Sequence, residues 1–254
     1  MDRYQLLKEK LARREKVLGT TMAMLNNTLI LEKMDRTDLD FVLFDAEHGV
    51  FDAQNVIPCL QTCRLMGLPS LVRVQDSEYF LIAKLIDMGA DGIMLPRTET
   101  PEQLRTAVDG LLFSPVGRKG MGGIAQFRPG ESFAEFPKTR LLMPQIESPR
   151  GIENLPAMLE QYGEWIDAVM IGPYDMSVMV GTPQNITSPV MLESIQKVFD
   201  ISSEYGKSTG IFCDNEEKAE LFRGMGANVL WVATDRDFYL RGYRETMDAV
   251  ARLG

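Results

Sequence analysis

The stretch from Leu141 to Asp175 predicts the fold of this chain. It contains two apolar runs, LLMPQI at Leu141–Ile146 and DAVMI at Asp167–Ile171, with a helical interval between them. Glu147 follows the first run directly, and Asp175 comes shortly after the second. Continuous apolar runs of this length are typical of parallel strands buried on both faces. If the two runs are neighbouring parallel strands, both carboxylates lie at the same edge of the sheet.

The same alternation of strand and helix extends along the whole sequence. Helical patterns fill the intervals between apolar runs, among them Phe51–Met66. We expect strands at Val17–Thr21, Asp40–Asp45, Ser70–Val74, Gly92–Leu95, Leu141–Ile146, Asp167–Ile171, Thr209–Cys213 and Asn228–Ala233.

Eight strands alternating with helices in 254 residues, with no low-complexity linker, predict an α/β fold: a (β/α)₈ TIM barrel forming a single domain over residues 1–254. We expect an N-terminal helix at residues 2–15 and a last helix at residues 235–253. A doubly wound open sheet is the alternative. It normally has fewer strands, and the glycine-rich GRKGMGG at Gly117–Gly123 does not follow the first strand as a dinucleotide-binding fingerprint would.

Two segments are expected to be irregular. Phe113–Thr139 is long for a loop in a compact domain, and such loops are usually functional lids or oligomer contacts. Met176–Pro183 reads MSVMVGTP, which is apolar for a loop, and a subunit contact is one interpretation.

Composition excludes several classes of partner. The net charge of −9 and the pI near 4.8 argue against nucleic acid or an anionic membrane. The start, MDRYQLLKEKLARREK, is charged and lacks the apolar core of a signal peptide or membrane span. Three cysteines are an odd number, so a disulfide framework is not expected and a cytoplasmic location is.

Active sites of barrels lie at the carboxyl ends of the strands, where this chain carries several reactive groups. His48, the only histidine, stands three residues after Asp45 in a turn that ends at Gly49. A carboxylate so near in sequence is expected to hold the imidazole in one orientation while its other nitrogen handles a proton. The alternative is that His48 has a structural role.

Arg73 lies in the otherwise apolar strand SLVRV. A buried guanidinium needs a partner, so Arg73 either forms an ion pair with a carboxylate such as Glu47 or faces an anionic substrate. Glu147 and Asp175 offer two hard oxygen ligands for a divalent ion, although Glu147 could instead cap the next helix and Asp175 close a turn.

Lysines at strand ends would suggest covalent imine chemistry. None of the candidates is expected at a carboxyl end, so imine chemistry is disfavoured; the lysines weighed are Lys84, Lys119, Lys138 and Lys207.

Several motifs, taken together, resemble the HpcH/HpaI family of metal-dependent pyruvate aldolases. They are FDAEHG, LVRV, GADGIMLPRTETPEQ, SPVGRKGMGG, PQIESPRGIENL and IGPYDMS, in this order, and the similarity runs from about Val17 to Arg252. The resemblance implies a reversible cleavage of a 4-hydroxy-2-keto acid or a 2-keto-3-deoxy sugar acid into pyruvate and an aldehyde through a metal-stabilised enolate. It also implies a homo-oligomer, typically a hexamer built as a trimer of dimers, in which the last helix is exchanged between partners.

The resemblance also implies roles for individual residues. Glu147 and Asp175 would bind Mg²⁺, Mn²⁺ or Co²⁺. His48, supported by Asp45, would be the acid/base, and Arg73 would hold the keto oxygen. The pyruvyl carboxylate would be received by the Gln145 side chain and by backbone amides around Gly172, Pro173, Tyr174 and Asp175.

One departure from the pattern and two other functions remain open. Many relatives place a Trp after the first strand, where this chain has Thr20, Thr21 and Met22. The shape of the aldehyde pocket is therefore expected to differ. The alternatives are a lyase of the citryl- or malyl-CoA type, which would need a pocket for pantetheine, and a barrel that binds a keto acid or metal without turnover.

Overall fold

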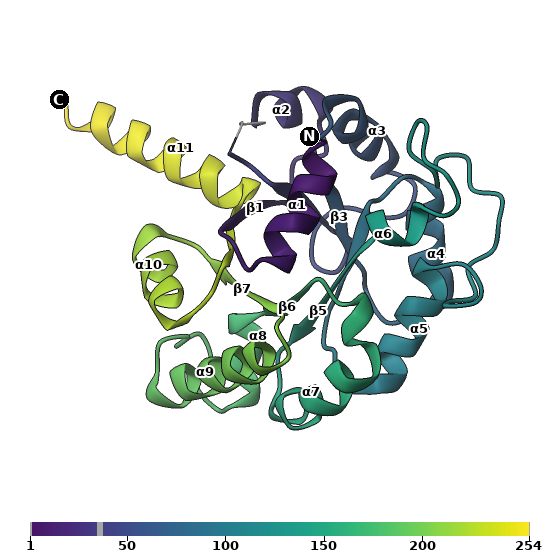
Figure 1. The fold of residues 1–254 in the computed structure, drawn as a ribbon. Coiled ribbons are helices and arrows are strands. Elements are labelled where there is room, and N and C mark those ends of the chain that lie inside the picture. The colour runs from purple at the N-terminus through teal and green to yellow at the C-terminus, as the bar shows by residue number, and fades with distance from the viewer. Residues whose placement is uncertain (1, 35–37, 254) are drawn as a thin grey trace.

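The computed structural model describes residues 2–34 and 38–253, so Met1, residues 35–37 and Gly254 of the predicted domain lie outside the described residues. Eight parallel strands close into one barrel in sequence order, which confirms the predicted single-domain (β/α)₈ fold (Figure 1). The strands are β1 (Val17–Met22), β2 (Phe41–Asp45), β3 (Ser70–Arg73), β4 (Gly92–Leu95), β5 (Leu141–Ile146), β6 (Ala168–Ile171), β7 (Ser208–Cys213) and β8 (Val229–Thr234).

The helices follow the strands around the outside of the barrel (Figure 1). They are α1 (Arg3–Ala12), α2 (Thr28–Met34), α3 (Ile57–Met66), α4 (Tyr79–Asp87), α5 (Pro101–Leu111), α6 (Phe136–Thr139), α7 (Pro149–Tyr162), the 3₁₀ turn η1 (Gly163–Trp165), α8 (Pro173–Met179), α9 (Pro189–Glu204), α10 (Glu216–Met225) and α11 (Asp235–Ala251).

Two helix predictions were wrong. The helix expected from Phe51 begins only at Ile57, because the Asp52 carboxylate accepts the backbone N–H groups of Gln54 and Asn55 and holds a turn there. The loop expected at residues 176–183 is helical in its first half, as part of α8. Pro173 occupies the first turn of α8, where a missing N–H costs nothing.

The barrel has two apolar layers because side chains alternate across each strand. One layer fills the barrel interior and includes Phe41, Met143 and Trp231. The other lies between the sheet and the helices and includes Phe44 and Ile146. Burial on both sides explains why the strands read as continuous apolar runs.

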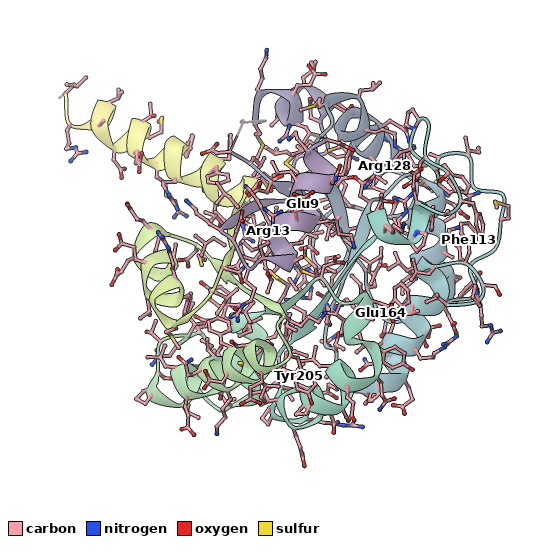
Figure 2. The ribbon with its side chains drawn as sticks, in the orientation of Figure 1. Glu9, Arg13, Phe113, Arg128, Glu164 and Tyr205 are labelled. Carbon is pink, nitrogen blue, oxygen red and sulfur yellow. The ribbon has the colours of Figure 1, made fainter. Side chains whose placement is uncertain are left out.

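The helix α1 closes the amino end of the barrel. Its Leu7 and Leu11 belong to the interior apolar layer. Lys8 binds Asp167 at 2.7 Å and Lys10 binds Asp40 at 2.5 Å, and both of these aspartates immediately precede strands. Figures 1 and 2 look onto this end, with α1 across it. The carboxyl ends of the strands therefore meet at the opposite end.

The long segment between α5 and β5 is fastened partly to the amino end. Arg128, labelled in Figure 2, lies 3.7 Å from the centre of the Tyr4 ring of α1 and binds Asp91 at 3.0 Å. Arg140 forms a buried ion pair with Glu131 at 2.6 Å. The segment is irregular as expected, apart from α6.

No helix within residues 2–34 and 38–253 has the length and apolar character that crossing a membrane requires.

Gly92 tests the packing of the barrel. Gly92 of β4 is in register with Leu141 of β5, and a Cβ atom added at Gly92 would lie 2.4 Å from the carbonyl oxygen of Leu141. Gly92→Ala should lower the free energy of unfolding by about 1–3 kcal/mol or more. The control is Gly224→Ala in α10, where nothing lies within 4 Å of the added methyl group. Because alanine favours the helix more than glycine does, this change should raise the free energy of unfolding by about 0.5–1 kcal/mol. Urea unfolding curves measure both, and equal stabilities would contradict the close strand contact.

Candidate active site

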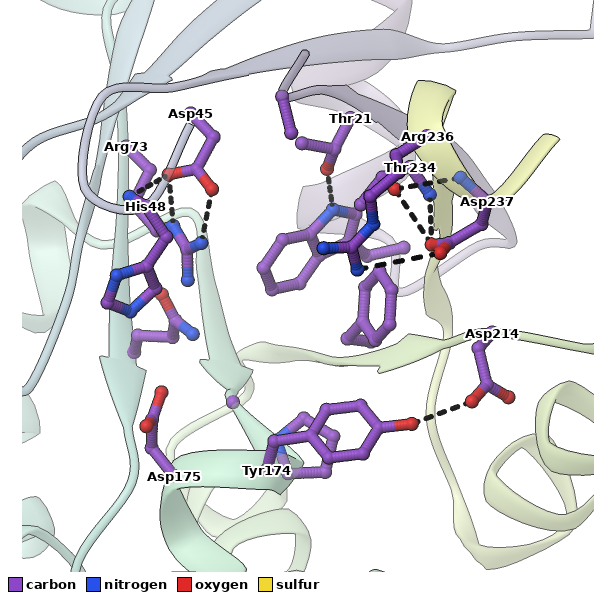
Figure 3. Close-up of a pocket in the computed structure, with 16 residues that line it drawn as sticks. Thr21, Asp45, His48, Arg73, Tyr174, Asp175, Asp214, Thr234, Arg236 and Asp237 are labelled. Atoms are coloured by element: carbon purple, nitrogen blue, oxygen red, sulfur yellow. Dashed lines mark hydrogen bonds and ion pairs between the residues drawn. The ribbon is translucent and has the colours of Figure 1, made fainter. Parts of the chain in front are cut away.

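A cavity of about 360 Å³ lies at the carboxyl ends of the strands (Figure 3). Eight of the nine predicted site residues line it, and only Glu147 does not. The lining residues include no lysine, in agreement with the argument against an imine. They are Thr21, Ala23, Asp45, His48, Arg73, Gln145, Gly172, Pro173, Tyr174, Asp175, Phe212, Asp214, Trp231, Thr234, Arg236 and Asp237.

Arg73 is held by two carboxylates at the bottom of this site. It lies directly across from Asp45 in the β2–β3 register, and its Nε and Nη2 donate to the two oxygens of Asp45 at 2.9 and 2.6 Å. Its Nη1 lies 3.3 Å from Glu47. Burial raises the pKa of Asp45, but the bonds from Arg73 outweigh burial and hold it below its usual range. Arg73 thus both forms an ion pair and lines the cavity.

The expected support of His48 by Asp45 is wrong. The Asp45 carboxylate binds Arg73 and the backbone N–H groups of Glu47 and His48, so it is not directed at the imidazole. The carboxylate nearest the ring is that of Glu47, with 3.7 Å between its Oε2 and His48 Nε2. The His48 side chain is 61% exposed at the cavity, so it is not a buried structural residue.

Glu147 and Asp175 come together as predicted from their strand ends. Burial, followed by the nearby Asp175 carboxylate, raises the pKa of Glu147 to about 8. Glu147 does not cap α7, because the Ser148 side chain does so by accepting the N–H of Gly151. Asp175 lies in the first turn of α8 rather than closing a turn.

Gln145 and Glu147 carry buried polar atoms with no hydrogen-bond partner among the described residues. These are both amide atoms of Gln145 and Oε2 of Glu147. A Cβ atom on Gly172 would lie 2.1 Å from that Oε2 and 2.4 Å from the Gln145 nitrogen, so only glycine fits there. Buried polar groups are normally satisfied, which marks this spot as a place for a ligand.

Backbone donors at α8 are fewer than predicted. Pro173 has no N–H, so it lines the cavity but cannot donate a hydrogen bond. The first amides of a helix have no partner within the helix, which leaves those of Tyr174 and Asp175 as candidates.

Sequence reasoning missed the site role of Arg97. Its backbone N–H donates to Glu147 Oε1 at 2.9 Å, and its Nε lies 3.5 Å from Glu47 Oε1. Its φ of 46° is left-handed, which is uncommon for a residue other than glycine and often accompanies a functional site. The signal available in the sequence was an arginine just past the fourth strand.

The outer half of the cavity was also missed. The Tyr174 hydroxyl donates to Asp214 at 2.6 Å, and Figure 3 shows this pair across the cavity from Asp45 and Arg73. Trp231 of β8 donates from its indole nitrogen to the Thr21 hydroxyl. A tryptophan therefore lies beside β1, as in the many relatives that carry one after their first strand, but here it belongs to β8.

Known proteins resemble this chain over nearly its whole length. The 5-keto-4-deoxy-D-glucarate aldolase of Shigella dysenteriae serotype 1 is 28% identical over 237 residues, 90% of each chain. The protein of the same name from Escherichia coli O6:H1 is 27% identical over 250 residues, covering 95% of this chain and 94% of its own.

Solved structures agree in fold. An HpcH/HpaI aldolase from Desulfitobacterium hafniense superposes with a TM-score of 0.87 at 24% identity, covering 96% of both chains. An HpcH/HpaI aldolase/citrate lyase family protein from Burkholderia cenocepacia J2315 gives 0.88 at 25% identity, covering 97% of this chain and 99% of its own.

The model of one protein family matches residues 22–241, which is most of the barrel and includes every predicted site residue. The protein belongs to the HpcH/HpaI aldolase/citrate lyase family.

Proposed function

We propose that the protein is a divalent-metal-dependent aldolase. It would reversibly cleave a 4-hydroxy-2-keto acid or a 2-keto-3-deoxy sugar acid into pyruvate and an aldehyde. The observation that carries the proposal is that the Arg73 guanidinium lies at the same end of the barrel as the neighbouring Glu147 and Asp175 carboxylates. Membership of an aldolase family and relatives named as aldolases support it.

The donor set fits a divalent cation. Four carboxyl groups gather here against two guanidinium groups, Arg73 and Arg97, so that about two negative charges would lack a counter-charge once all four carboxyls are ionised; the carboxyl groups are those of Asp45, Glu47, Glu147 and Asp175. Glu147 and Asp175 would hold the ion, with water and substrate as its other ligands. Among the described residues no group of three or more His, Cys, Asp or Glu forms a metal cage, as expected for a site with two protein ligands. When bound, such an ion would act as a Lewis acid toward the keto acid.

Arg73 would bind the keto end of the substrate. A guanidinium has five N–H donors, and Asp45 takes only two of those on Arg73. Its Nη1 also lies 3.3 Å from Glu47, and the guanidinium lines the cavity together with Gln145. The donors that these two carboxylates do not take would hold the keto oxygen. Fixed donors aimed at a developing negative charge lower the barrier most in a site shielded from water. The Gln145 amide and the free N–H groups of α8 would bind the carboxylate.

His48 would move the proton. It is exposed at the cavity and lies close to Glu47. In cleavage it would accept the proton of the C4 hydroxyl while the bond between C3 and C4 breaks, and a proton would then be returned to C3 to give pyruvate. In the reverse direction it would take a proton from the pyruvate methyl group, that carbon would bond to the aldehyde carbon, and the aldehyde oxygen would receive a proton. Glu47, rather than Asp45, is positioned to influence the imidazole.

We also propose that the protein forms a hexamer and that it is cytoplasmic. The helix α11 extends away from the barrel (Figure 1), and its aromatic residues Tyr239 and Tyr243 are more than half exposed. An apolar groove of about 720 Å³ beside its start is lined by residues of β1, α2 and β8. Exchange of α11 between subunits of a hexamer would cover both surfaces. A cytoplasmic location is consistent with three buried cysteines that form no disulfide.

Metal removal tests the activity directly. Release of pyruvate from a panel of 4-hydroxy-2-keto acids and 2-keto-3-deoxy acids should stop with EDTA and return with Mg²⁺ or Mn²⁺. Glu147→Gln should reduce release by about two orders of magnitude or more, because a Lewis acid contributes several kcal/mol. Glu153→Gln, an exposed change on α7, is the matched control. Release that is insensitive to EDTA would contradict the proposed metal dependence.

Proton competition gives a second test of the ion site. Because the pKa of Glu147 is raised to about 8, this carboxyl is protonated below that pH and a metal must displace the proton. Affinity for Mn²⁺ should fall by about tenfold per pH unit below about pH 8 and level off above it. Titration calorimetry from about pH 6 to about pH 9 measures this slope. The slope should disappear in Glu147→Gln, and a flat wild-type profile would argue against Glu147 as a ligand.

Assembly is tested on α11. Tyr243→Asp adds a charge to a surface that should be buried between subunits, so analytical ultracentrifugation should show a hexamer for the wild type and smaller species for the variant. Leu65→Asp, at a leucine of α3 that is 89% exposed, should leave the hexamer intact. A monomeric wild type would refute the exchange.

A further inference from the structure

The outer half of the cavity has an aromatic wall. Tyr174 of α8, Phe212 of β7 and Trp231 of β8 lie in a row, with ring centroids 6.3 Å and 5.1 Å apart. All three line the cavity, and the Arg73 guanidinium lies 5.6 Å from the Trp231 ring. The wall thus begins at the keto-binding end and continues outward. Aromatic faces favour contact with the C–H groups of a small carbon chain.

A fixed carboxylate stands at the far end of this wall. Asp214 directly follows β7, and its Oδ2 accepts hydrogen bonds from the Tyr174 hydroxyl at 2.6 Å and from Lys218 at 2.7 Å. Its Oδ1 is buried and has no hydrogen-bond partner among the described residues. The side chain is therefore held in place from one oxygen, and the other is an unsatisfied acceptor in a residue that lines the cavity, whereas buried polar groups are normally satisfied. A hydroxyl group of a bound molecule is a suitable donor.

The cations that contact the two aspartates at this end are already paired, so neither is free to receive a second carboxylate on the substrate. Asp214 and Asp237 line this end together with Arg236, and Lys218 lies 2.7 Å from Asp214. Arg236 lies 3.6 Å from Asp237 and its side chain is 61% exposed, so its charge is partly neutralised and screened. Burial raises the pKa of Asp214, but Lys218 and Tyr174 outweigh burial and keep it low, so Asp214 is ionised at neutral pH.

We propose that Asp214 determines which aldehyde the enzyme accepts. Its carboxylate, positioned by Tyr174 and Lys218, accepts a hydrogen bond from a hydroxyl of the aldehyde half of the substrate. The preferred aldehyde is then short, neutral and hydroxylated, not one with its own carboxylate. This inference rests on the proposed aldolase function, and it separates the chain from relatives named for glucarate, a dicarboxylic acid.

The test runs the reaction in the direction of synthesis, with Mg²⁺ and pyruvate. The pyruvate methyl carbon loses a proton and bonds to the aldehyde carbon, and the aldehyde oxygen takes up a proton. Three aldehydes are compared. Glyceraldehyde carries hydroxyl groups, succinic semialdehyde carries a carboxylate, and propionaldehyde carries neither. The wild type should prefer glyceraldehyde by about tenfold or more in kcat/KM, the range expected for a hydrogen bond to a charged group.

Asp214→Asn should remove most of this preference and improve the use of succinic semialdehyde. Asp200→Asn, the same chemical change at an exposed position on α9, is the matched control and should leave the preference intact. Tyr174→Phe tests positioning: Lys218 still holds Asp214, so KM for glyceraldehyde should rise more than kcat falls.

Exchange of the pyruvate methyl protons in D₂O, without aldehyde, separates this inference from the proposed function. Each synthesis rate is divided by the exchange rate of the same preparation, so a partly folded variant does not mimic lost specificity. A wild type that exchanges no protons overturns the aldolase function itself. Exchange without a preference for glyceraldehyde, or a preference that survives Asp214→Asn, overturns only the role of Asp214.

Discussion

Burial of a guanidinium at the rim of the barrel is the constraint on which the site depends. Arg73 is only 8% exposed, and a buried charge without partners would be prohibitively costly. Strand register supplies Asp45 across from it, and the following turn supplies Glu47. Arg97 then contacts Glu47 with its side chain and donates its backbone N–H to Glu147, so ion pairs and one hydrogen bond join the ends of four neighbouring strands, β2 to β5. Removing one member of such a buried pair typically costs about 3–5 kcal/mol, so the same contacts hold the rim together and aim its reactive groups.

Most of the fold could be predicted because burial on both faces leaves a strong local signature. The apolar runs at 92–95 and 141–146 became strands with the predicted bounds, and the helical interval expected between the runs at 141–146 and 167–171 contains α7. The errors arose where local pattern and chain path differ. An aspartate turn delayed α3, and α8 was hidden because a Gly-Pro start followed by apolar residues resembles a turn and loop.

The sequence predicted which residues gather at the site, but not which of them contact one another. Eight of nine expected residues line one cavity, since the ends of parallel strands must converge. The partner of Asp45 was wrong because closeness in sequence suggested His48, whereas strand register selected Arg73, 28 residues away. Asp214 and Arg97 could not be assigned in advance, because their roles depend on contacts made by side chains from other strands.

The helix that closes the amino end has a consequence for the kinetics of the proposed reaction. With Leu7 and Leu11 packed into the barrel interior, the amino end is closed and the cavity lies at the opposite end. In the proposed binding mode, the keto half lies at Arg73 and the aldehyde half lies across the cavity, beside Asp214. Both products of cleavage would therefore leave through the same mouth, and both substrates of synthesis would enter through it. Either product left in that mouth would slow the exchange of the other, so a structural plug far from the reacting atoms would affect turnover.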